Sequence, residues 1–204
     1  MQVSKDHYKF ENYTDIPRWV SYWNQIKEVL ELKPKSVLII GPGDGVVSDY
    51  LKKHIDLVHT FDIAPDLKPD IQGSVLDLGN HLTQKYDVIV CCQVLEHLPY
   101  ENFEKALSEV QQFSTHFVLS LPYAHTNLFE FFFRLPKKVS LYFNLVLPKF
   151  YKTWKFDGEH YWEIGTKSYS KYKIRSDISK YFEVKSSYHM KFNRYHMFYV
   201  LTSC

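Results

Sequence analysis

A short apolar run that leads straight into a cluster of glycines is the feature that most constrains the fold. Val37-Leu38-Ile39-Ile40 is followed by Gly41-Pro42-Gly43-Asp44-Gly45, and a helical pattern begins at once with Val46 and Val47. A continuous apolar run of this length is typical of a strand buried on both faces of a parallel sheet. Glycines at the following turn let a ligand approach the backbone closely. The segment therefore predicts a strand-turn-helix unit that either binds a ligand or is simply a tight turn.

Strand-like and helix-like segments alternate through the first part of the chain. Strands are expected at 36–40, 57–61, 71–75, 86–92 and 116–121. Helices are expected near 15–32, from 46 onwards and at 101–113, and Asp15 is the expected cap of the first one. This alternation predicts a parallel α/β sheet with helices on both faces.

The end of the chain has a different order. A helix is expected near 169–180, followed by two β-like runs at 182–190 and 195–202. The connection between these runs is too short for a parallel crossover, so they should pair antiparallel. We expect one domain over residues 1–204, with a seven-stranded mixed sheet that is parallel except for one antiparallel terminal strand. Residues 1–33 should form an N-terminal arm and helix, and 123–166 an insertion after strand five.

Composition narrows the function classes. The chain has 204 residues and a formal net charge of +2, which argues against a nucleic-acid binder that relies on bulk charge. Three cysteines, two of them adjacent at Cys91 and Cys92, indicate a reducing and therefore cytoplasmic compartment. We expect no membrane-spanning helix, because no apolar run reaches the roughly 18 residues that one needs.

A carboxylate at the end of the second expected strand identifies the class of ligand. Asp62 follows the glycine turn at a distance where an acid can accept both hydroxyls of a ribose. Both NAD and S-adenosylmethionine carry such a ribose. The turn reads Gly-Pro-Gly-Asp-Gly and lacks the dinucleotide spacing Gly-x-Gly-x-x-Gly. Asp44 would also repel a pyrophosphate, so the pattern disfavours NAD.

Four segments together resemble the class I S-adenosylmethionine-dependent methyltransferases. They are Val37–Gly45, Phe61–Ile63, Gly73–Leu78 and Asp87–Leu98. The resemblance implies a Rossmann-like fold, S-adenosylmethionine as cofactor and methyl transfer as the activity.

The resemblance also implies a role for each cofactor-site residue. The three glycines of the turn would pass under the methionine part, Asp62 would hold the ribose, and the residues after strands three and four would flank the adenine and the sulfonium. The cofactor-binding residues are thus expected to be Gly41, Gly43, Gly45, Asp62, Ile63, Asp77, Leu78, Cys92 and Gln93.

One position departs from the family pattern. Ile39 stands where the family usually has an acid that organises the methionine ammonium, a task that backbone carbonyls and Asp44 could take over. A protein that binds the cofactor without catalysis is therefore an alternative.

The segment Gln93-Val94-Leu95-Glu96-His97 is expected to face the methyl acceptor. It is similar to the Glu-x-x-Glu-His run of metal-dependent O-methyltransferases in ubiquinone biosynthesis and at small-RNA 3′ ends, but Gln93 replaces the first acid. Magnesium prefers charged oxygen ligands, so we expect no metal. His97 is either a polar cap of the next helix or a general base, since its ordinary pKa is about 6.5.

A second histidine lies in the segment Asp157–Gly165, after the apolar part of the insertion. His160 stands beside Glu159 and among aromatic residues, where it could supply a base in an aromatic pocket. The alternative is a loop that only anchors the insertion to the sheet. His125 is a further candidate. We take His97 and His160 as the candidate catalytic residues.

The insertion at 123–166 is the most individual part of the sequence. It is expected to form one or two helices that cover the active site as a substrate lid. Its apolar aromatic residues and lysines over 128–150 also suit contact with a membrane or a lipid-linked acceptor. A basic and aromatic face could meet RNA, but the small net charge makes nucleic acid an unlikely partner.

The sequence and this resemblance thus predict a methyltransferase that methylates oxygen on a small-molecule or glycan-type acceptor. Three alternatives remain open: a metal-assisted RNA 2′-O-methyltransferase, a nonenzymatic cofactor-binding module and an NAD-dependent reductase. The oligomeric state is not predicted. The expected location is the cytoplasm, with peripheral contact to the membrane as an extension.

Overall fold

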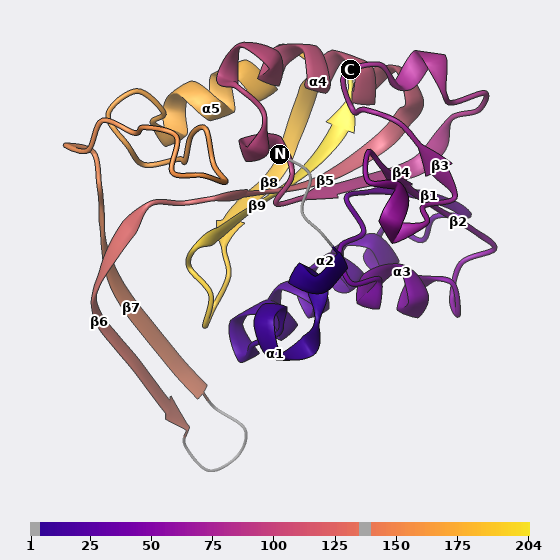
Figure 1. The fold of residues 1–204 in the computed structure, drawn as a ribbon. Helices are drawn as coiled ribbons and strands as arrows, with labels where there is room; N and C mark the ends of the chain where they lie inside the picture. The colour runs from indigo at the N-terminus through magenta and orange to yellow at the C-terminus, as the bar shows by residue number, and fades with distance from the viewer. Residues whose placement is uncertain (1–4, 135–139) are drawn as a thin grey trace.

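The computed structural model describes residues 5–134 and 140–204, and its centre is a seven-stranded sheet (Figure 1). The strand order is β3-β2-β1-β4-β5-β9-β8. The strands are β1 (Ser36–Ile40), β2 (Leu57–Asp62), β3 (Ile71–Gln72), β4 (Tyr86–Cys92), β5 (Ser114–Pro122), β8 (Phe182–His189) and β9 (His196–Ser203).

The strand directions confirm the predicted mixed sheet. β1 pairs parallel with β2 and β4, β2 with β3, and β4 with β5. β9 pairs antiparallel with both β5 and β8, so it is the one antiparallel strand. The carboxyl ends of β1, β2 and β4 therefore meet at one edge, where ligands bind in open α/β sheets.

Helices cover both faces of the sheet, as expected. Figure 1 shows α2 and α3 on one face and α4 and α5 on the other. The helices are α1 (Phe10–Tyr13), α2 (Ile16–Glu31), α3 (Val46–Leu51), α4 (Phe103–Phe113) and α5 (Lys171–Ile178), with short 3-10 turns at Lys5–Tyr8, Pro65–Leu67, Leu78–Asn80, Leu95–His97 and Tyr100–Asn102. Asp15 caps α2 by accepting a hydrogen bond from the Arg18 amide at 2.7 Å.

Two hydrophobic clusters hold the three layers together. Phe103, Leu107 and Ile174 pack between the sheet and the α4–α5 layer. Tyr22 and Leu51 pack between the sheet and the α2–α3 layer. Because β1, β2, β4, β5 and β9 contribute residues to both clusters, the centre of the sheet is buried on both faces, which explains the continuous apolar runs in β1 and β4.

Several predicted boundaries were too long. The third strand was expected at 71–75 but ends at Gln72, because the chain turns at Gly73 to pack closely against Phe61. The tail helix was expected at 169–180 and spans Lys171–Ile178, where Ser170 caps its start.

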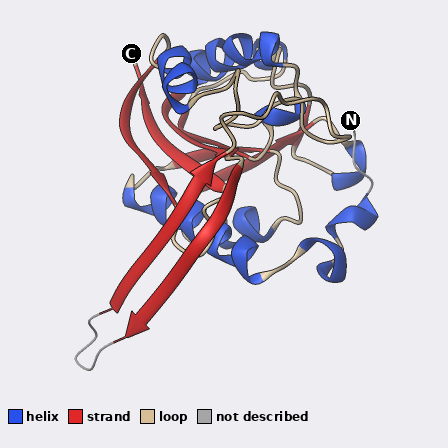
Figure 2. Cartoon of the chain, turned by 90° about the vertical axis from the view of Figure 1, so that its left-hand side faces the viewer, coloured by secondary structure: helices blue, strands red, loops and turns tan. Residues whose placement is uncertain are grey.

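The insertion was wrongly predicted to be helical. It begins with a β-hairpin of β6 (His125–Arg134) and β7 (Ser140–Pro148), which projects from the body of the molecule (Figure 2). The strand pairing puts Phe129 and Phe131 on one face of the hairpin and Glu130 on the other, as successive residues of a strand alternate. After the hairpin, an irregular segment returns to the sheet, where Ala124 donates to the Ile164 carbonyl at 2.8 Å. In the described part of the chain, no helix combines the length and hydrophobicity that crossing a bilayer requires.

Candidate functional site

The glycine turn between β1 and α3 lines a cavity at the carboxyl edge of the sheet. Gly41, Gly43 and Gly45 have φ values of 70°, 59° and 84°, in the left-handed region that favours glycine. A Cβ added at Gly41 would lie 2.4 Å from a Val94 methyl carbon. The turn therefore depends on glycine for its backbone conformation and for its close packing against the end of β4.

The cavity at this edge of the sheet has a volume of ≈ 250 Å³. Its walls come from the amino-terminal arm and from the segments that follow β1, β2, β3 and β4. The lining residues are Tyr8, Tyr13, Ile40, Gly41, Gly43, Phe61, Asp62, Ile63, Ala64, Gly73, Ser74, Val75, Cys92, Gln93, Val94, His97 and Leu98. Seven of the eleven predicted site residues thus line one cavity: Gly41, Gly43, Asp62, Ile63, Cys92, Gln93 and His97.

Asp62 presents the cavity's acidic group at the end of β2. Its Oδ1 accepts a hydrogen bond from the Ala64 amide at 2.8 Å, which fixes the orientation of the carboxylate. Burial raises the pKa of this carboxyl, although the Ala64 and Ile63 amides oppose the shift. The neighbouring Ile63 side chain is 62% exposed and available for contact with a flat ring. This pair can hold a ribose and an adjoining aromatic base.

Four predicted residues lie outside this cavity. Gly45 lines an adjoining hollow together with Asp44. The chain enters a 3-10 turn after Asp77, whose Oδ1 lies 3.6 Å from His81 Nε2, and Leu78 is fully buried. His160 stands beside His97 but does not line the cavity.

The amino-terminal arm contributes two cavity residues that were not predicted from the sequence. Tyr8 and Tyr13 line the cavity, and burial raises the pKa of Tyr13 to about 12, so its hydroxyl stays protonated. The Arg18 guanidinium lies over the Tyr13 ring, 3.7 Å from its centroid. No local sequence signal places these tyrosines at the site, because packing of the arm against the sheet brings them there.

Ile39, which replaces the usual acid, faces away from the cavity. It is 2% exposed and packs in the cluster between the sheet and α2. The glycine turn is fixed instead through Asp44, which accepts from the Tyr22 hydroxyl at 2.6 Å and from the Val46 amide at 3.3 Å. These two bonds supply an anchor for the turn that does not depend on position 39.

The end of β4 forms a sharp polar corner. Gln93 has a φ of 57°, its amide donates to the Ser120 carbonyl at 3.0 Å, and its side chain donates to Ser120 Oγ at 3.2 Å. Burial raises the pKa of the Cys92 thiol to about 12. Cys92 is therefore a neutral wall residue rather than a nucleophile.

His97 is a neutral imidazole at the far end of the cavity. Its Nδ1 lies 2.9 Å from the Glu159 carbonyl oxygen, which can only accept, so Nδ1 carries the proton and Nε2 has the free lone pair. Burial lowers the pKa of His97, and nearby His160 lowers it further, against an opposing effect of the Glu159 carbonyl. This tautomer and charge suit a general base.

His160 belongs to a hydrogen-bonded group next to His97. The two imidazole rings have centroids 4.9 Å apart. His160 Nδ1 lies 2.9 Å from Glu163 Oε1, which also accepts from the Tyr195 hydroxyl at 2.5 Å. Burial alone would lower the pKa of His160, but the bond to Glu163 and the charge of Glu96 raise it overall. His160, whose pKa is raised, therefore lies beside His97, whose pKa is lowered.

Glu96 is a buried acid whose importance the sequence did not reveal. It is fully buried, and neither carboxylate oxygen meets a hydrogen-bond partner among the described residues. Burial raises its pKa to about 8. Ligand atoms of Glu96, His97 and His160 lie within 4.8 Å of one another, as do those of Asp157, His160 and Glu163. Either set has the donor types that could hold a divalent cation.

Comparisons with known proteins agree on one family. A family model described as "Methyltransferase domain" matches residues 18–170. A search of curated proteins returned no match. Among solved structures, the N-methyltransferase NodS from Bradyrhizobium japonicum WM9, in complex with S-adenosylhomocysteine, is 10% identical with a TM-score of 0.61, over 95% of this chain and 91% of that one.

Two further solved structures have the same fold. The magnesium protoporphyrin IX methyltransferase from Synechocystis PCC 6803, with bound S-adenosylhomocysteine, is 16% identical with a TM-score of 0.57, over 91% of this chain and 82% of that one. The methyltransferase domain of bacterial CtHen1 is 15% identical with a TM-score of 0.61, over 91% of this chain and 99% of that one. At these identities, the likeness concerns the fold.

Proposed function

The chain belongs to the methyltransferase-domain family as a class I S-adenosylmethionine-dependent methyltransferase, and from this premise we propose that it methylates a hydroxyl oxygen on a small-molecule or glycan-type acceptor. S-adenosylmethionine is the cofactor, and when bound it supplies an electrophilic methyl group on a sulfonium. Family membership favours an enzyme over a nonenzymatic binding module and over an NAD-dependent reductase.

The residues of the cavity fit this cofactor. The glycine turn lines the cavity with backbone at Gly41 and Gly43, and Asp62 lines the same cavity with an oriented carboxylate. Ile63 offers an exposed apolar side chain beside Asp62 for the adenine ring. We assign the ribose to Asp62 and the base to Ile63, with Ser74 and Val75 as additional walls. The roles predicted for Asp77 and Leu78 at the adenine remain predictions.

The neutral His97 carries the proposal of oxygen as the acceptor atom. A hydroxyl must lose a proton as its oxygen gains the methyl group, whereas a neutral amine attacks through a lone pair that it already has. His97 lines the cavity with a free lone pair on Nε2, which can take that proton. The Glu159 carbonyl fixes the ring orientation, so the base is held in place before the acceptor arrives.

The acceptor is proposed to bind where the cavity meets the irregular segment of the insertion. Glu159 and His160 lie next to His97, and the Tyr161 amide donates to the Glu96 carbonyl at 2.9 Å. These contacts join the insertion to the segment after β4. We therefore assign acceptor recognition to residues 157–163, rather than to the hairpin.

The experiment is a methyl-transfer assay with labelled S-adenosylmethionine and paired hydroxyl and amine analogues, from phenols to glycans and lipid-linked glycans. We expect transfer to the hydroxyl compounds. His97→Ala should lower turnover by about 10²-fold or more, while S-adenosylhomocysteine affinity stays unchanged. Exposed His54 provides the matched control, since His54→Ala should retain full turnover. Preferred methylation of the amines, or an unaffected His97→Ala variant, would refute the proposal.

A second candidate is metal-assisted 2′-O-methylation of RNA. Glu96, His97 and His160 bring two imidazoles and a buried acid together, and this cluster favours it. Glu96 would be a cation ligand, and its unpartnered carboxylate would gain a counter-charge. Loss of activity with a chelator and its recovery with magnesium would support this candidate. Activity that does not change with the chelator would reject the metal-assisted candidate and support His97 as a general base that works without a metal.

We place the reaction in the cytoplasm. Cys91, Cys92 and Cys204 are all free thiols, and the exposed Cys204 would be open to oxidation outside a reducing compartment. Labelling of unreduced, freshly lysed cells with a thiol reagent should find all three thiols reactive after unfolding. Recovery of a disulfide-linked form would contradict this placement.

A further inference from the structure

The β6–β7 hairpin has two unlike faces. Its register pairs Phe129 with Leu145, Phe131 with Phe143, and Phe133 with Leu141. Because successive residues of a strand point to opposite faces, these six side chains share one face, which we call the outer face. The residues between them, such as Glu130, Phe132 and Tyr142, form the inner face.

The inner face is turned toward the body of the molecule. Phe132 and Tyr142 pack against Phe192 in the β8–β9 turn, with ring centroids 5.4 Å and 4.8 Å apart. The Phe192 amide donates to the Tyr142 hydroxyl at 3.0 Å, and that hydroxyl donates to Glu130 at 2.8 Å. Tyr142 and Glu130 of the inner face are thus partnered within the chain.

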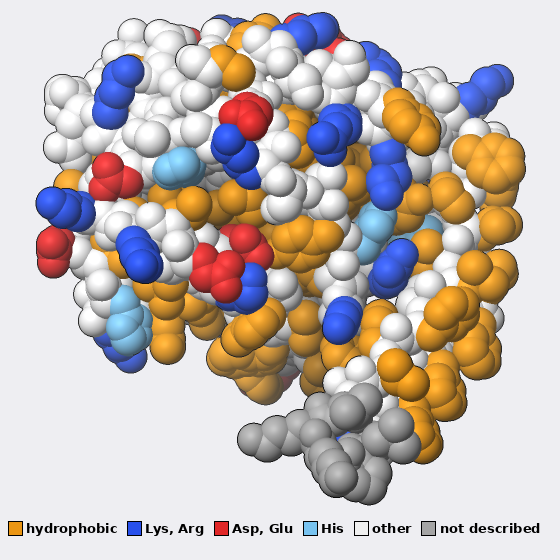
Figure 3. Space-filling view, turned by 180° about the vertical axis from the view of Figure 1, so that it is seen from behind, with side chains coloured by type: hydrophobic (Ala, Val, Ile, Leu, Met, Phe, Trp, Pro, Cys, Tyr) orange, Lys and Arg blue, Asp and Glu red, His pale blue; other side chains and the backbone are white. Residues whose placement is uncertain are grey.

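The outer face is left uncovered. Each of its six residues is between 46% and 58% exposed. Phe129, Phe131 and Phe133 are stacked along one strand, with neighbouring centroids 6.4 Å and 6.1 Å apart. Figure 3 shows a nearly continuous run of hydrophobic side chains along the hairpin. A contiguous apolar strip on a projecting element marks an interaction surface.

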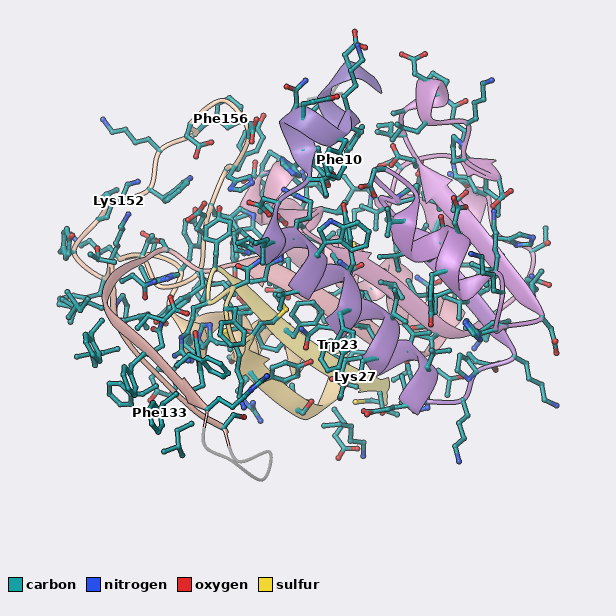
Figure 4. All side chains as sticks on the ribbon, turned by 90° about the horizontal axis from the view of Figure 1, so that it is seen from below. Phe10, Trp23, Lys27, Phe133, Lys152 and Phe156 are labelled. Atoms are coloured by element: carbon teal, nitrogen blue, oxygen red, sulfur yellow. The ribbon has the colours of Figure 1, made fainter. Side chains whose placement is uncertain are left out.

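The charged residues near the outer face indicate which kind of partner it binds. Among the described residues of 125–156, four are basic (Arg134, Lys149, Lys152 and Lys155) and Glu130 is the single acid. Glu130 and Arg134 both lie on the inner face, and the three lysines follow β7 at the base of the hairpin. Figure 4 shows Lys152 and Phe156 on the loop beyond the base of the hairpin and Phe133 toward its far end. A second copy would bring like charges together, whereas a layer of anionic headgroups attracts them.

We propose that the outer face of the β6–β7 hairpin docks on the surface of a bilayer that contains anionic lipids. The phenylalanine and leucine side chains enter the boundary between headgroups and acyl chains, and the lysines at the base contact the phosphates. A two-stranded hairpin has unpaired backbone groups along its edges, which need water, so it lies in the interface and does not cross the hydrocarbon core. This docking is independent of which acceptor is methylated.

The test is flotation of the full chain with phosphatidylcholine vesicles, with and without phosphatidylglycerol. We expect the protein to float with the anionic vesicles and to be released partly by salt. The double variant Phe131→Ser/Phe143→Ser removes one cross-strand pair from the outer face and should weaken binding roughly tenfold or more. Lys149→Glu/Lys152→Glu should remove the preference for anionic vesicles while leaving the apolar strip intact.

The matched control is Tyr50→Ser, which removes an exposed aromatic side chain from α3, away from the hairpin. It should float like the unchanged protein, and circular dichroism should show all variants folded. Failure of the unchanged protein to float, or equal flotation of the outer-face variant, would overturn the proposal. A dimer in light scattering that the outer-face variant dissociates, without vesicle binding, would overturn it in favour of a second copy.

Discussion

Replacing Asp62 tests the cofactor site with the least change in shape. Asp62→Asn keeps an oxygen that can accept from the Ala64 amide at 2.8 Å, but it removes the charge that a ribose hydroxyl would meet. A hydrogen bond to a charged group contributes about 1.5–3 kcal/mol, so affinity for S-adenosylhomocysteine should fall by about tenfold to about 150-fold. Asp62→Ala also leaves the Ala64 amide unpaired and should lie at the upper end of this range.

The assay is a calorimetric titration with S-adenosylhomocysteine, and pH adds a second signature. Because burial raises the folded pKa of Asp62, its carboxylate is protonated as pH falls through a value above the usual 3.8, and affinity should decline over that range. Asp62→Asn should lack this acid limb. Asp66→Asn, at an exposed acid outside the cavity, is the control. An Asp62→Asn affinity within twofold of the unchanged protein, roughly 0.4 kcal/mol, would refute the assignment.

Three further changes test the local physics. Gly41→Ala should lower the melting temperature by several degrees, since the left-handed φ costs about 1–2 kcal/mol and the new Cβ meets Val94. Gly158 also has a positive φ, of 108°, but a Cβ there meets open space, so Gly158→Ala isolates the backbone strain from the clash. Glu96→Gln should raise the melting temperature at alkaline pH but not in acid. Burial raises the folded pKa of Glu96 to about 8, so its contribution to the free energy of unfolding is fully present below the usual pKa of 4.5 and is lost as pH rises through about 8. An equal gain in melting temperature at all pH values would contradict this. Tyr22→Phe removes a 2.6 Å hydrogen bond to the glycine turn and should weaken S-adenosylhomocysteine binding several-fold in calorimetry, whereas an unchanged affinity would mean that the turn is held without it.

The parts of the fold that the sequence predicted are those whose burial is complete. The runs Val37–Ile40 and Val88–Cys91 are apolar throughout because helices cover both faces of the sheet. The hairpin was missed for the opposite reason. Leu128–Phe133 is almost uniformly apolar, so its period is weak, and its strand partner is the separate segment Ser140–Pro148. The pairing of these two segments decided the structure.

The residues of the candidate site also fall into two groups: those predicted from local sequence features, and those that only packing of distant segments brings to the site. Gly41 and Asp62 could be predicted because a turn and a strand end are local features of the chain. Tyr13 reaches the cavity only through packing of the arm, which no local pattern specifies. Glu96 was recognised in the sequence as part of the segment after β4. Its burial without a hydrogen-bond partner could not be predicted, because that burial depends on the segment at 157–163 folding over the end of β4.

The position of β9 has a consequence for how the chain folds during synthesis. This strand follows the other six strands of the sheet in the sequence, yet it lies inside the sheet, between β5 and β8. Until it leaves the ribosome, β5 presents an open edge to other nascent chains, and unpaired edges promote aggregation. Loss of the residues from His196 onward would therefore open the middle of the sheet rather than trim its end, and expression of such a truncated chain should yield insoluble protein.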